Sequence, residues 1–511
     1  MALRINFNAE ATTTHTALLQ NERAMNKSLL RISTGNRILS AADDAAGLFI
    51  ADQLSTVAAA LNQGNSNIQT GISALQIAET NVAQIYDKLQ TIYTKAQSAA
   101  NDINDPNARA AIQSDISNLI DAIQKIGTDT EYNGIRLLDG TFINKAIHYG
   151  PRADQTITVG LNNVKASDIG AHMVQGQYVT NVSTSGAYGS TSSAVSANFS
   201  WSSGDQAKVS GIDVSQGLTF AVDAKTIADN INSSTALRNQ GISARANNVS
   251  TAASDWTDIQ TSASQTVAIK FFVGSESTAD IEVTVGPNKT LSLSDLVAQI
   301  NSQASEKNLG ITARTENNKL VLTTNGETIG LEVGATSSGT ESSISVNLGQ
   351  FMNVSGTVSA SNTSATGSAI QVGKLTILGT NSFNYDFTGI STTSEGLGVS
   401  DSENSTFKNL YSIDVSSNEG AELALDIANI ASQKVDTVRT QIGSVVNNLQ
   451  AIYDAQKAAY DNTKEAENVI RNTDFAAEMS TFTTMQIRMQ AGMAMLAQAN
   501  TLPQLVLQLL R

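Results

Sequence analysis

The 511-residue chain contains no cysteine, which excludes disulfide frameworks, cysteine nucleophiles and cysteine-ligated zinc sites. Proline occurs only four times, far below the roughly 5% of average proteins, so long uninterrupted helices are possible. Charged residues make up 15% of the chain, against about 25% in ordinary globular proteins. If such a chain is secreted, its stability has to come from a source other than disulfides, such as assembly.

The balance of charge and hydrophobicity narrows the class of protein further. The formal net charge of −15 argues against nucleic-acid binding, which needs basic surfaces to displace counterions from phosphates. No apolar run approaches the roughly 18 residues that span a bilayer, so we expect no membrane insertion. The first residues lack an apolar core and a small-residue cleavage site, so we expect no cleaved signal peptide.

Composition divides the chain into two similar ends and a different middle. Residues 1–140 and 405–511 are rich in Ala, Leu, Ile, Gln and Asn, whereas 175–400 are rich in Ser, Thr and Gly. A chain of this length predicts about three domains. The sequence therefore predicts an α+β protein with long paired, coiled-coil-like helices built from both ends and a β-rich α+β insertion in the middle.

The N-terminal end carries a long helical pattern. Apolar or small residues recur at steps of three and four from Leu54 to Ala96, a heptad-like seam longer than the usual globular helix. Asp105-Pro106 is typical of the start of a second helix, which we expect to end at Gly127. The following Tyr132-Asn-Gly-Ile135 predicts a hairpin turn.

The C-terminal end repeats this design. A second apolar stripe runs from Ile427 to Tyr453, and the polar segment 470–474 indicates a break that caps a further helix. That helix places Phe, Met and Leu side chains on one side, and we expect Pro503 to end or kink it.

Neither end has enough neighbours in the sequence to bury these stripes. We expect the two ends to pack on each other and then on other copies of the chain, which makes the protein a homopolymer. An intramolecular bundle is the alternative. The residues predicted to form subunit–subunit contacts are Leu18, Met25, Leu29, Ile32, Leu54, Val57, Leu61, Ile68, Leu75, Val82, Ile85, Leu89, Ile442, Leu449, Phe475, Met479, Phe482, Leu496, Leu505 and Leu509.

The middle contains two copies of one pattern, near 223–248 and 291–324. Each copy begins as a short amphipathic helix, passes through a glycine turn and continues as a strand that starts Gly-Ile-Ser/Thr-Ala-Arg. Alternating apolar residues predict further strands at 266–273, 280–285 and 319–324.

The usual signatures of catalysis are missing from the sequence. His15, His148 and His172 are not spaced as metal ligands, and no nucleophile elbow or phosphate-binding loop occurs. Asp43 and Asp44 form an acidic pair without a supporting base or metal ligand, so we expect them to cap a loop or helix. We therefore expect no enzymatic activity, no catalytic or metal site and no cofactor.

Several segments at the two ends go beyond periodicity, namely 28–38, 40–52, 132–138, 490–500 and 503–511. Together they closely resemble bacterial flagellin, the subunit of the flagellar filament, in the order in which flagellins carry them. The middle repeat is similar to a small insertion motif found in many flagellin variable regions.

The resemblance implies a filament subunit used in swimming motility and located outside the cell. Such a chain would leave unfolded through the flagellar type III export apparatus and polymerise beneath the filament cap on the hook-junction proteins. Residues 1–45 with 471–511 would form the inner tube, 46–170 with 405–470 the surrounding core, and 171–404 the outward variable domain. A flagellin chaperone would bind the C-terminal helix. The residues that the resemblance assigns to it are Phe482, Met485, Met489 and Leu496.

The resemblance also implies a contact with an innate immune receptor of the Toll-like class. In many flagellins that receptor contacts a basic and apolar stretch of the long N-terminal helix, which corresponds here to Leu89, Thr91 and Lys95, with a further acidic contact at Asp115. Thr91 stands where an arginine is expected, and threonine cannot supply the forked donors of a guanidinium. We expect weak activation of the receptor.

Two alternatives remain open from the sequence. A hook–filament junction protein shares the terminal pattern but does not form long filaments by itself. A flagellin whose insertion carries an enzymatic or adhesive role, the latter through Ser/Thr glycans, is the other alternative.

Overall fold

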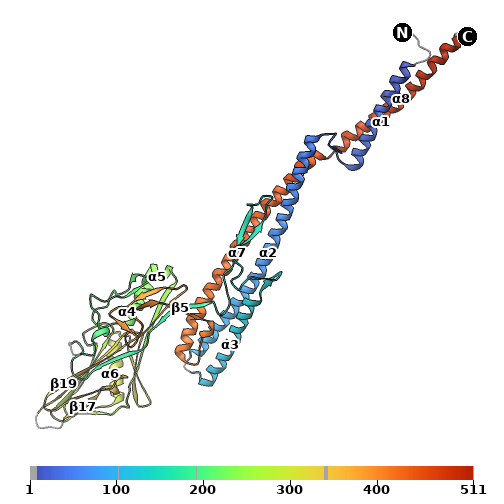
Figure 1. Ribbon diagram of the computed structural model, residues 1–511. Coiled ribbons are helices and arrows are strands. Elements are labelled where there is room, and N and C mark those ends of the chain that lie inside the picture. Colours follow the sequence, from blue (N-terminus) through green and yellow to red (C-terminus); the bar gives the residue numbers. More distant parts are fainter. Residues whose placement is uncertain (1–7, 102, 191–192, 339–342, 510–511) are drawn as a thin grey trace. The chain divides into compact units, whose positions relative to one another are not determined.

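The computed structural model describes residues 8–101, 103–190, 193–338 and 343–509, with the side chains of Ala197 and of 502–509 outside that description. The predicted class is confirmed, because both ends are long helices and the middle is rich in strands (Figure 1). The long helices are α1 (Ala9–Thr34), α2 (Ala45–Ala99), α3 (Pro106–Asp129), α7 (Asn418–Arg471) and α8 (Phe475–Leu509).

The chain folds into two compact units, each built from separate stretches of sequence. Unit 1 comprises Met1–Thr80, Glu131–Asn162 and Thr440–Arg511. Unit 2 comprises Asn81–Thr130 and Asn163–Arg439. The long helices α2 and α7 each contribute one part to either unit.

In unit 1, the α1–α8 pair joins residues from opposite ends of the sequence. Asn8 caps α1 by accepting from the Ala11 amide at 3.1 Å, and its Nδ2 donates to the Ala499 carbonyl at 2.9 Å. The Arg31 guanidinium lies 3.8 Å from the Glu478 carboxylate. These contacts align the two helices along their length, side by side (Figure 1).

The segment that joins α1 to α2 and the segment that joins α7 to α8 form an isolated β-bridge with each other. Gly35 ends α1 with φ +75°, and the next residue, Asn36, bridges to Asn472, which follows α7. The Arg37 amide donates to the Arg471 carbonyl at 2.7 Å. The two passages of the chain are therefore bonded to each other.

A β-hairpin packs against α2 and α7 in unit 1. Its strands are β3 (Lys145–His148) and β4 (Thr156–Val159). A Cβ built on Gly64 would lie 2.0 Å from the Tyr149 carbonyl oxygen, so the hairpin approaches α2 where a side chain is missing. About two helical turns further along α2, a Cβ on Gly71 would meet Ile147 of the hairpin and Leu449 of α7. Gly64 thus allows the backbone of the hairpin to approach the helix closely, and Gly71 leaves room for the side chains of Ile147 and Leu449.

The predicted start of α3 is confirmed and its predicted end is wrong. Asp105 Oδ1 accepts from the Ala108 amide at 2.6 Å, as an N-cap does. The helix runs on through Gly127 to Asp129. Gly127 instead allows a close approach, since a Cβ there would lie 3.0 Å from the Lys165 Cα. The hairpin predicted beyond it forms between β1 (Glu131–Tyr132) and β2 (Ile135–Arg136).

The predicted break before the last helix is also confirmed. Asp474 Oδ1 accepts from the Ala476 and Ala477 amides at 2.9 and 3.2 Å, which caps α8. Pro503 does not end the last helix, because α8 continues through it to Leu509. The expectation that the helix ends there is therefore wrong.

The middle of the chain forms two main antiparallel sheets in unit 2 (Figure 1). The six-stranded sheet has the order β14 (Thr312–Glu316), β15 (Lys319–Thr324), β9 (Ile242–Thr251), β20 (Lys374–Gly379), β5 (Gly170–Gln175) and β25 (Thr406–Asn409). The five-stranded sheet has the order β12 (Ile281–Val285), β11 (Gln265–Val273), β16 (Ile329–Ser337), β19 (Ser364–Val372) and β6 (Val179–Ser183). The strands predicted at 266–273, 280–285 and 319–324 are β11, β12 and β15, so these predictions are confirmed to within a residue.

Shorter elements complete the middle. A four-stranded sheet has the order β24 (Ser402–Asn404), β21 (Asn384–Asp386), β7 (Lys208–Val209) and β8 (Ile212–Asp213). Two-stranded pairs are β10 (Ile259–Gln260) with β13 (Thr290–Leu291), β17 (Ile344–Asn347) with β18 (Thr357–Ala360), and β22 (Ser391–Thr392) with β23 (Glu395–Gly396).

The two copies of the sequence repeat have the same local structure. The first is α4 (Ala224–Ser233) followed by the short α5 (Thr235–Asn239) and β9, and the second is α6 (Leu293–Glu306) followed by β14. Apolar side chains of α4 and α6 lie buried in two separate hydrophobic clusters, one for each copy. Each copy thus contributes its own helix to its own core.

Candidate assembly surface

The residues predicted for subunit contacts divide into a buried and an accessible group. The buried group, each no more than 5% exposed, consists of Leu61, Ile68, Leu75, Val82, Ile85, Leu89, Ile442 and Leu449. All lie on α2 or α7. Contacts within the chain already cover these side chains, and α2 contacts α7 at Gly71 and Leu449, which agrees with the expectation that the two ends pack on each other. A role of these residues in contacts between copies stays a prediction.

The accessible group lies mainly on α1 and α8. Leu29, Phe475 and Met479 are 50%, 54% and 47% exposed. Half-buried members are Leu18, Met25, Ile32, Phe482 and Leu496, together with Leu54 and Val57 at the start of α2. Leu505 and Leu509 fall among the side chains outside the described part of α8.

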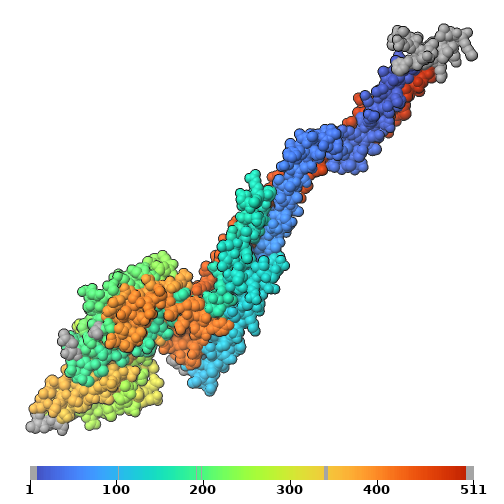
Figure 2. All heavy atoms as spheres, in the orientation of Figure 1, coloured from blue at the N-terminus to red at the C-terminus, as the bar shows by residue number. Residues whose placement is uncertain are grey.

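Exposed large apolar side chains on α1 and α8 define what we call the terminal apolar surface. Its members are Leu19, Leu29, Leu30, Phe475, Met479, Ile487, Met493 and Met495. Figure 2 shows α1 in blue against α8 in red. Two helices side by side cover only the faces that they turn to each other, so the apolar side chains on the remaining faces stay in water.

Sequence reasoning missed part of this surface. Leu19, Leu30 and Ile487 are 40%, 55% and 61% exposed, and none belongs to the predicted stripes. The prediction followed a single stripe on each helix, whereas α8 carries apolar residues around more than one face. A helix that is apolar on all sides is normally buried on all sides, and that signal was available in the sequence.

The predicted chaperone residues lie on the side of α8 that is turned toward α1. Phe482, Met485, Met489 and Leu496 are all half-buried. Gly492 belongs to the same stripe, and a Cβ built on it would lie 3.0 Å from Leu18 Cδ1. In this conformation α1 therefore occupies part of the stripe.

Charged contacts fix the turn between α1 and α2. Asp43 Oδ2 accepts from the Leu39 and Ser40 amides at 3.0 and 3.2 Å, and its other oxygen pairs with Lys27. The Lys27 hydrogen bond and these amides lower the pKa of Asp43 to about 2. Asp44 Oδ1 accepts from the Gly47 amide at 2.8 Å. The capping role predicted for this acidic pair is confirmed.

The residues of the implied receptor region differ in accessibility. Leu89 is fully buried, whereas Thr91 is exposed and its hydroxyl donates to the Asp87 carbonyl at 2.9 Å. Lys95 Nζ lies 2.8 Å from Asp115 Oδ2, which links α2 to α3. Two of the four side chains are thus already paired with each other.

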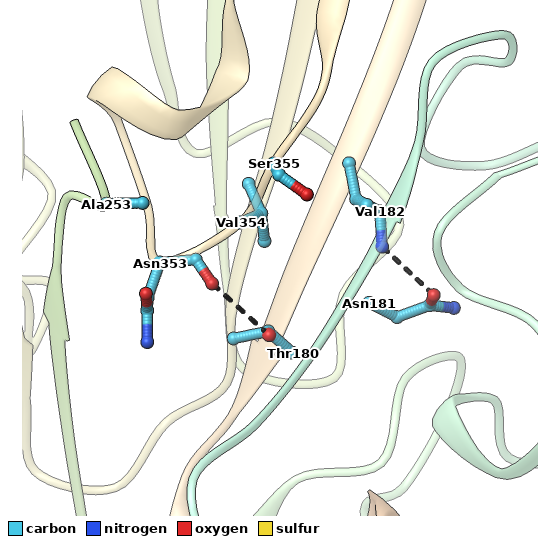
Figure 3. A pocket seen from close by; sticks show the side chains of 7 residues that line it. All are labelled: Thr180, Asn181, Val182, Ala253, Asn353, Val354 and Ser355. Carbon is cyan, nitrogen blue, oxygen red and sulfur yellow. Dashed lines mark hydrogen bonds between the residues drawn. The ribbon is translucent and has the colours of Figure 1, made fainter.

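A polar hollow of about 360 Å³ lies beside the edge strand β6 (Figure 3). Thr180, Asn181 and Val182 line one side, and Asn353, Val354 and Ser355 line the other, together with Ala253. The Thr180 hydroxyl donates to the Asn353 carbonyl at 3.3 Å across it. Its lining includes no acid, base or charged side chain.

Metal binding and membrane insertion are two further classes of site. Within residues 8–101, 103–190, 193–338 and 343–509, no group of three His, Asp or Glu side chains is placed to hold a metal ion. No helix in the same described segments is both long and apolar enough to cross a membrane.

Comparisons with known proteins identify the relatives of this chain. Residues 5–143 match the bacterial flagellin N-terminal helical region, and 425–510 match the bacterial flagellin C-terminal helical region. A flagellin of Aquifex pyrophilus is 54% identical and one of Aquifex aeolicus is 49% identical, each over the whole length of both chains.

A solved structure, the flagellar junction protein FlgL from Legionella pneumophila, is similar over 83% of this chain and 99% of its own. Its identity is 9% and its TM-score 0.32, values too low to choose between a filament and a junction protein. The flagellin sequences, by contrast, match from one end of the chain to the other. The chain belongs to the bacterial flagellin family.

Proposed function

We propose that this chain is a structural subunit that polymerises into the bacterial flagellar filament, and that it buries the terminal apolar surface in doing so. The observation that carries the proposal is the gathering of half-exposed Leu, Phe, Ile and Met side chains on α1 and α8. Soluble monomers rarely expose so many large apolar side chains together, and such surfaces mark sites of protein association.

The energetic argument follows from the area that assembly removes from water. Full burial of one Leu, Phe or Met side chain contributes about 1.5–3 kcal/mol. Side chains that are already half-buried contribute a fraction of that, but every copy in a polymer repeats the contribution. Self-association of α1 and α8 is therefore strongly favoured once the copies are aligned.

The positions of the chain segments within the filament follow from the same argument. We place 1–45 with 471–511 in the inner tube of the filament, 46–170 with 405–470 in the surrounding core, and 171–404 on its outside. The apolar α1 and α8 support the inner position, and the Ser/Thr-rich middle supports the outer one.

Export and localisation belong to the same proposal. The subunit leaves the cell unfolded through the flagellar export apparatus, escorted by a chaperone that binds Phe482, Met485, Met489 and Leu496. It then adds to an extracellular filament beneath the cap, above the hook-junction proteins. The absence of cysteine supports this route, since no disulfide can obstruct threading of the chain.

Polymerisation of the purified chain tests the proposal. We expect salted-out protein to form long filaments under the electron microscope, whereas a junction protein would not. A Leu29→Ser, Met479→Ser variant should stay folded and fail to polymerise. Val249→Ser is the control. Val249 is 37% exposed on β9 of the six-stranded sheet, so its substitution should not affect polymerisation. Normal filaments from the double variant would contradict the assigned surface.

A further inference from the structure

The sulfur atoms of this chain are concentrated on one helix. There is no cysteine, and five of the nine methionines lie between Met479 and Met495 on α8. Met479, Met493 and Met495 are 47%, 52% and 63% exposed. The other two, Met485 and Met489, are half-buried.

The methionines of the middle of the chain are in the opposite situation. Met173 on β5 is 1% exposed, and Met352 is fully buried in a hydrophobic cluster. Oxidants attack thioethers that they can reach, so the same molecule holds reachable and unreachable methionines. The chain has no thiol, and Met479, Met493 and Met495 are the most exposed thioethers among the residues that the structure describes.

We propose that Met479, Met485, Met489, Met493 and Met495 form an oxidation-sensitive modification site that controls whether the subunit can assemble. A peroxide transfers one oxygen to each thioether: the O–O bond breaks, an S=O bond forms, and hydrogen peroxide leaves as water. The sulfur loses two electrons and the peroxide gains them. This inference rests on the proposed function, because it requires α8 to be buried in the filament.

The chemical consequence of the modification is opposite to what assembly needs. A sulfoxide is a polar hydrogen-bond acceptor, whereas the terminal apolar surface is stabilised in the filament by leaving water. Burying a polar group without a partner weakens association by about tenfold per group. Several sulfoxides on one helix should therefore block polymerisation without unfolding the middle of the chain.

The location of the site also predicts when it is vulnerable. In the free subunit the α8 methionines contact water, and in the filament neighbouring copies cover them. Oxidation should then act on subunits before assembly and spare those already assembled. Because methionine sulfoxide is a substrate of methionine sulfoxide reductases, the block should be reversible.

The experiment compares the full-length wild type with a variant in which these five methionines are replaced by leucine. Both are treated as monomers with hydrogen peroxide, freed of it and salted out, and sulfoxides are located by peptide mass spectrometry. We expect oxidised wild type to form at least ~10-fold less sedimentable filament, and the leucine variant to be unaffected by peroxide. A Met173→Leu, Met352→Leu variant should remain as sensitive as wild type.

The possible outcomes separate the two proposals. Full polymerisation of wild type carrying sulfoxides on α8 would overturn the inference, as would equal oxidation of Met173 and Met352. If the leucine variant assembles poorly before treatment, recovery of oxidised wild type by methionine sulfoxide reductases A and B supports the inference, and failure to recover overturns it. A further sample of wild type is treated with peroxide after assembly. Equal oxidation of α8 in these filaments and in monomers would contradict burial of this helix, and so the proposed function.

Discussion

Asn232 on α4 binds both backbone polar groups of Ala244 on β9, accepting from its N–H at 2.9 Å and donating to its carbonyl at 2.6 Å. The second repeat contains the same arrangement, in which Asn301 on α6 binds the N–H and carbonyl of Ala313 on β14, both at 2.8 Å. The Asn side chain takes the place of the water or the further strand that would otherwise bond to these two backbone groups. One side-chain amide in each repeat thus satisfies the hydrogen bonds of a strand residue that has no neighbouring strand on that side.

Removing this amide should matter most in the second repeat, because β14 is the edge strand of its sheet. We expect Asn301→Ala to lower the free energy of unfolding by about 1–3 kcal/mol and to increase self-association of the middle region. Urea unfolding and size-exclusion chromatography check both effects. Asn239→Ala, which removes an exposed amide on α5, is the control and should change neither.

The arginine that follows each of these alanines has a different environment in the two repeats. Arg245 lies 2.6 Å from Glu422 and 2.8 Å from Asp426 on α7, whereas Arg314 reaches Glu316 at 3.4 Å on its own strand. Burial raises the pKa of Asp426, so loss of its arginine leaves a poorly hydrated carboxylate. We expect Arg245→Ala to destabilise unit 2 by about 1–3 kcal/mol, and Arg314→Ala by less than about 0.5 kcal/mol.

Thermal unfolding of the two arginine variants measures this difference. Addition of Asp426→Asn to Arg245→Ala should restore part of the loss, because it removes the unpaired charge. Equal losses of stability from the two arginine substitutions would mean that the contact of Arg245 with α7 does not stabilise the protein.

Acid should act on the turn between α1 and α2 through Asp43. Its pKa of about 2 in the folded chain lies below the ordinary value of about 3.9, so the ionised form is favoured by folding. The stabilisation is fully present above about pH 4 and is lost as the pH falls through about 2. We expect Asp43→Asn to lower the Tm of unit 1 at pH 7 and to have little effect below pH 2. A difference in Tm that stays constant over this range would show that the charge is not responsible.

Two glycines of the long helices provide a matched test of the hairpin contact. Gly64→Ala would place its Cβ against the Tyr149 carbonyl, and we expect a loss of about 1–3 kcal/mol. Gly443 on α7 has no neighbouring atom within 4 Å of a Cβ built on it, so Gly443→Ala should stabilise the helix by about 1 kcal/mol. Denaturant unfolding distinguishes the two. Stabilisation by both substitutions would refute a close approach of the hairpin.

Receptor activation is predicted to be weak because Thr91 lacks the donors of an arginine. The exposed position of Thr91 on α2 leaves room for the longer side chain. We expect the purified monomer to be a poor agonist in a Toll-like receptor reporter-cell assay, and Thr91→Arg to raise its potency about tenfold or more. Full potency of the unmodified chain would contradict this prediction.

Much of the fold follows from local signals that need no tertiary information. Asp105 and Asp474 start helices because their carboxylates accept from nearby amides of the first turn, and the alternation of Ile281–Val285 indicates a strand. Gly127 misled the prediction because its role is a close approach to Lys165, a residue far along the chain. Local sequence shows that a glycine is present, but not which neighbour requires it.

The assembly surface was harder to predict for a related reason. The stripes containing Leu75 and Leu29 are both apolar, yet Leu75 is 1% exposed and Leu29 is 50% exposed. Periodicity shows that a helix face needs a partner, but it does not say whether the partner belongs to the same chain. Only the placement of α7 against α2, seen in the hydrogen bond from Gln69 to Tyr453, decides that question.

The bond between Asn8 and Ala499 closes a loop of 491 residues. Closing so long a loop has a large entropic cost, and it requires that both ends of the chain be free in the same compartment at the same time. A chain that passes through a narrow channel from one end to the other cannot make this contact until its last residues have emerged. On the proposed export route, α1 and α8 would therefore form their paired helices only after the whole chain has passed through the channel.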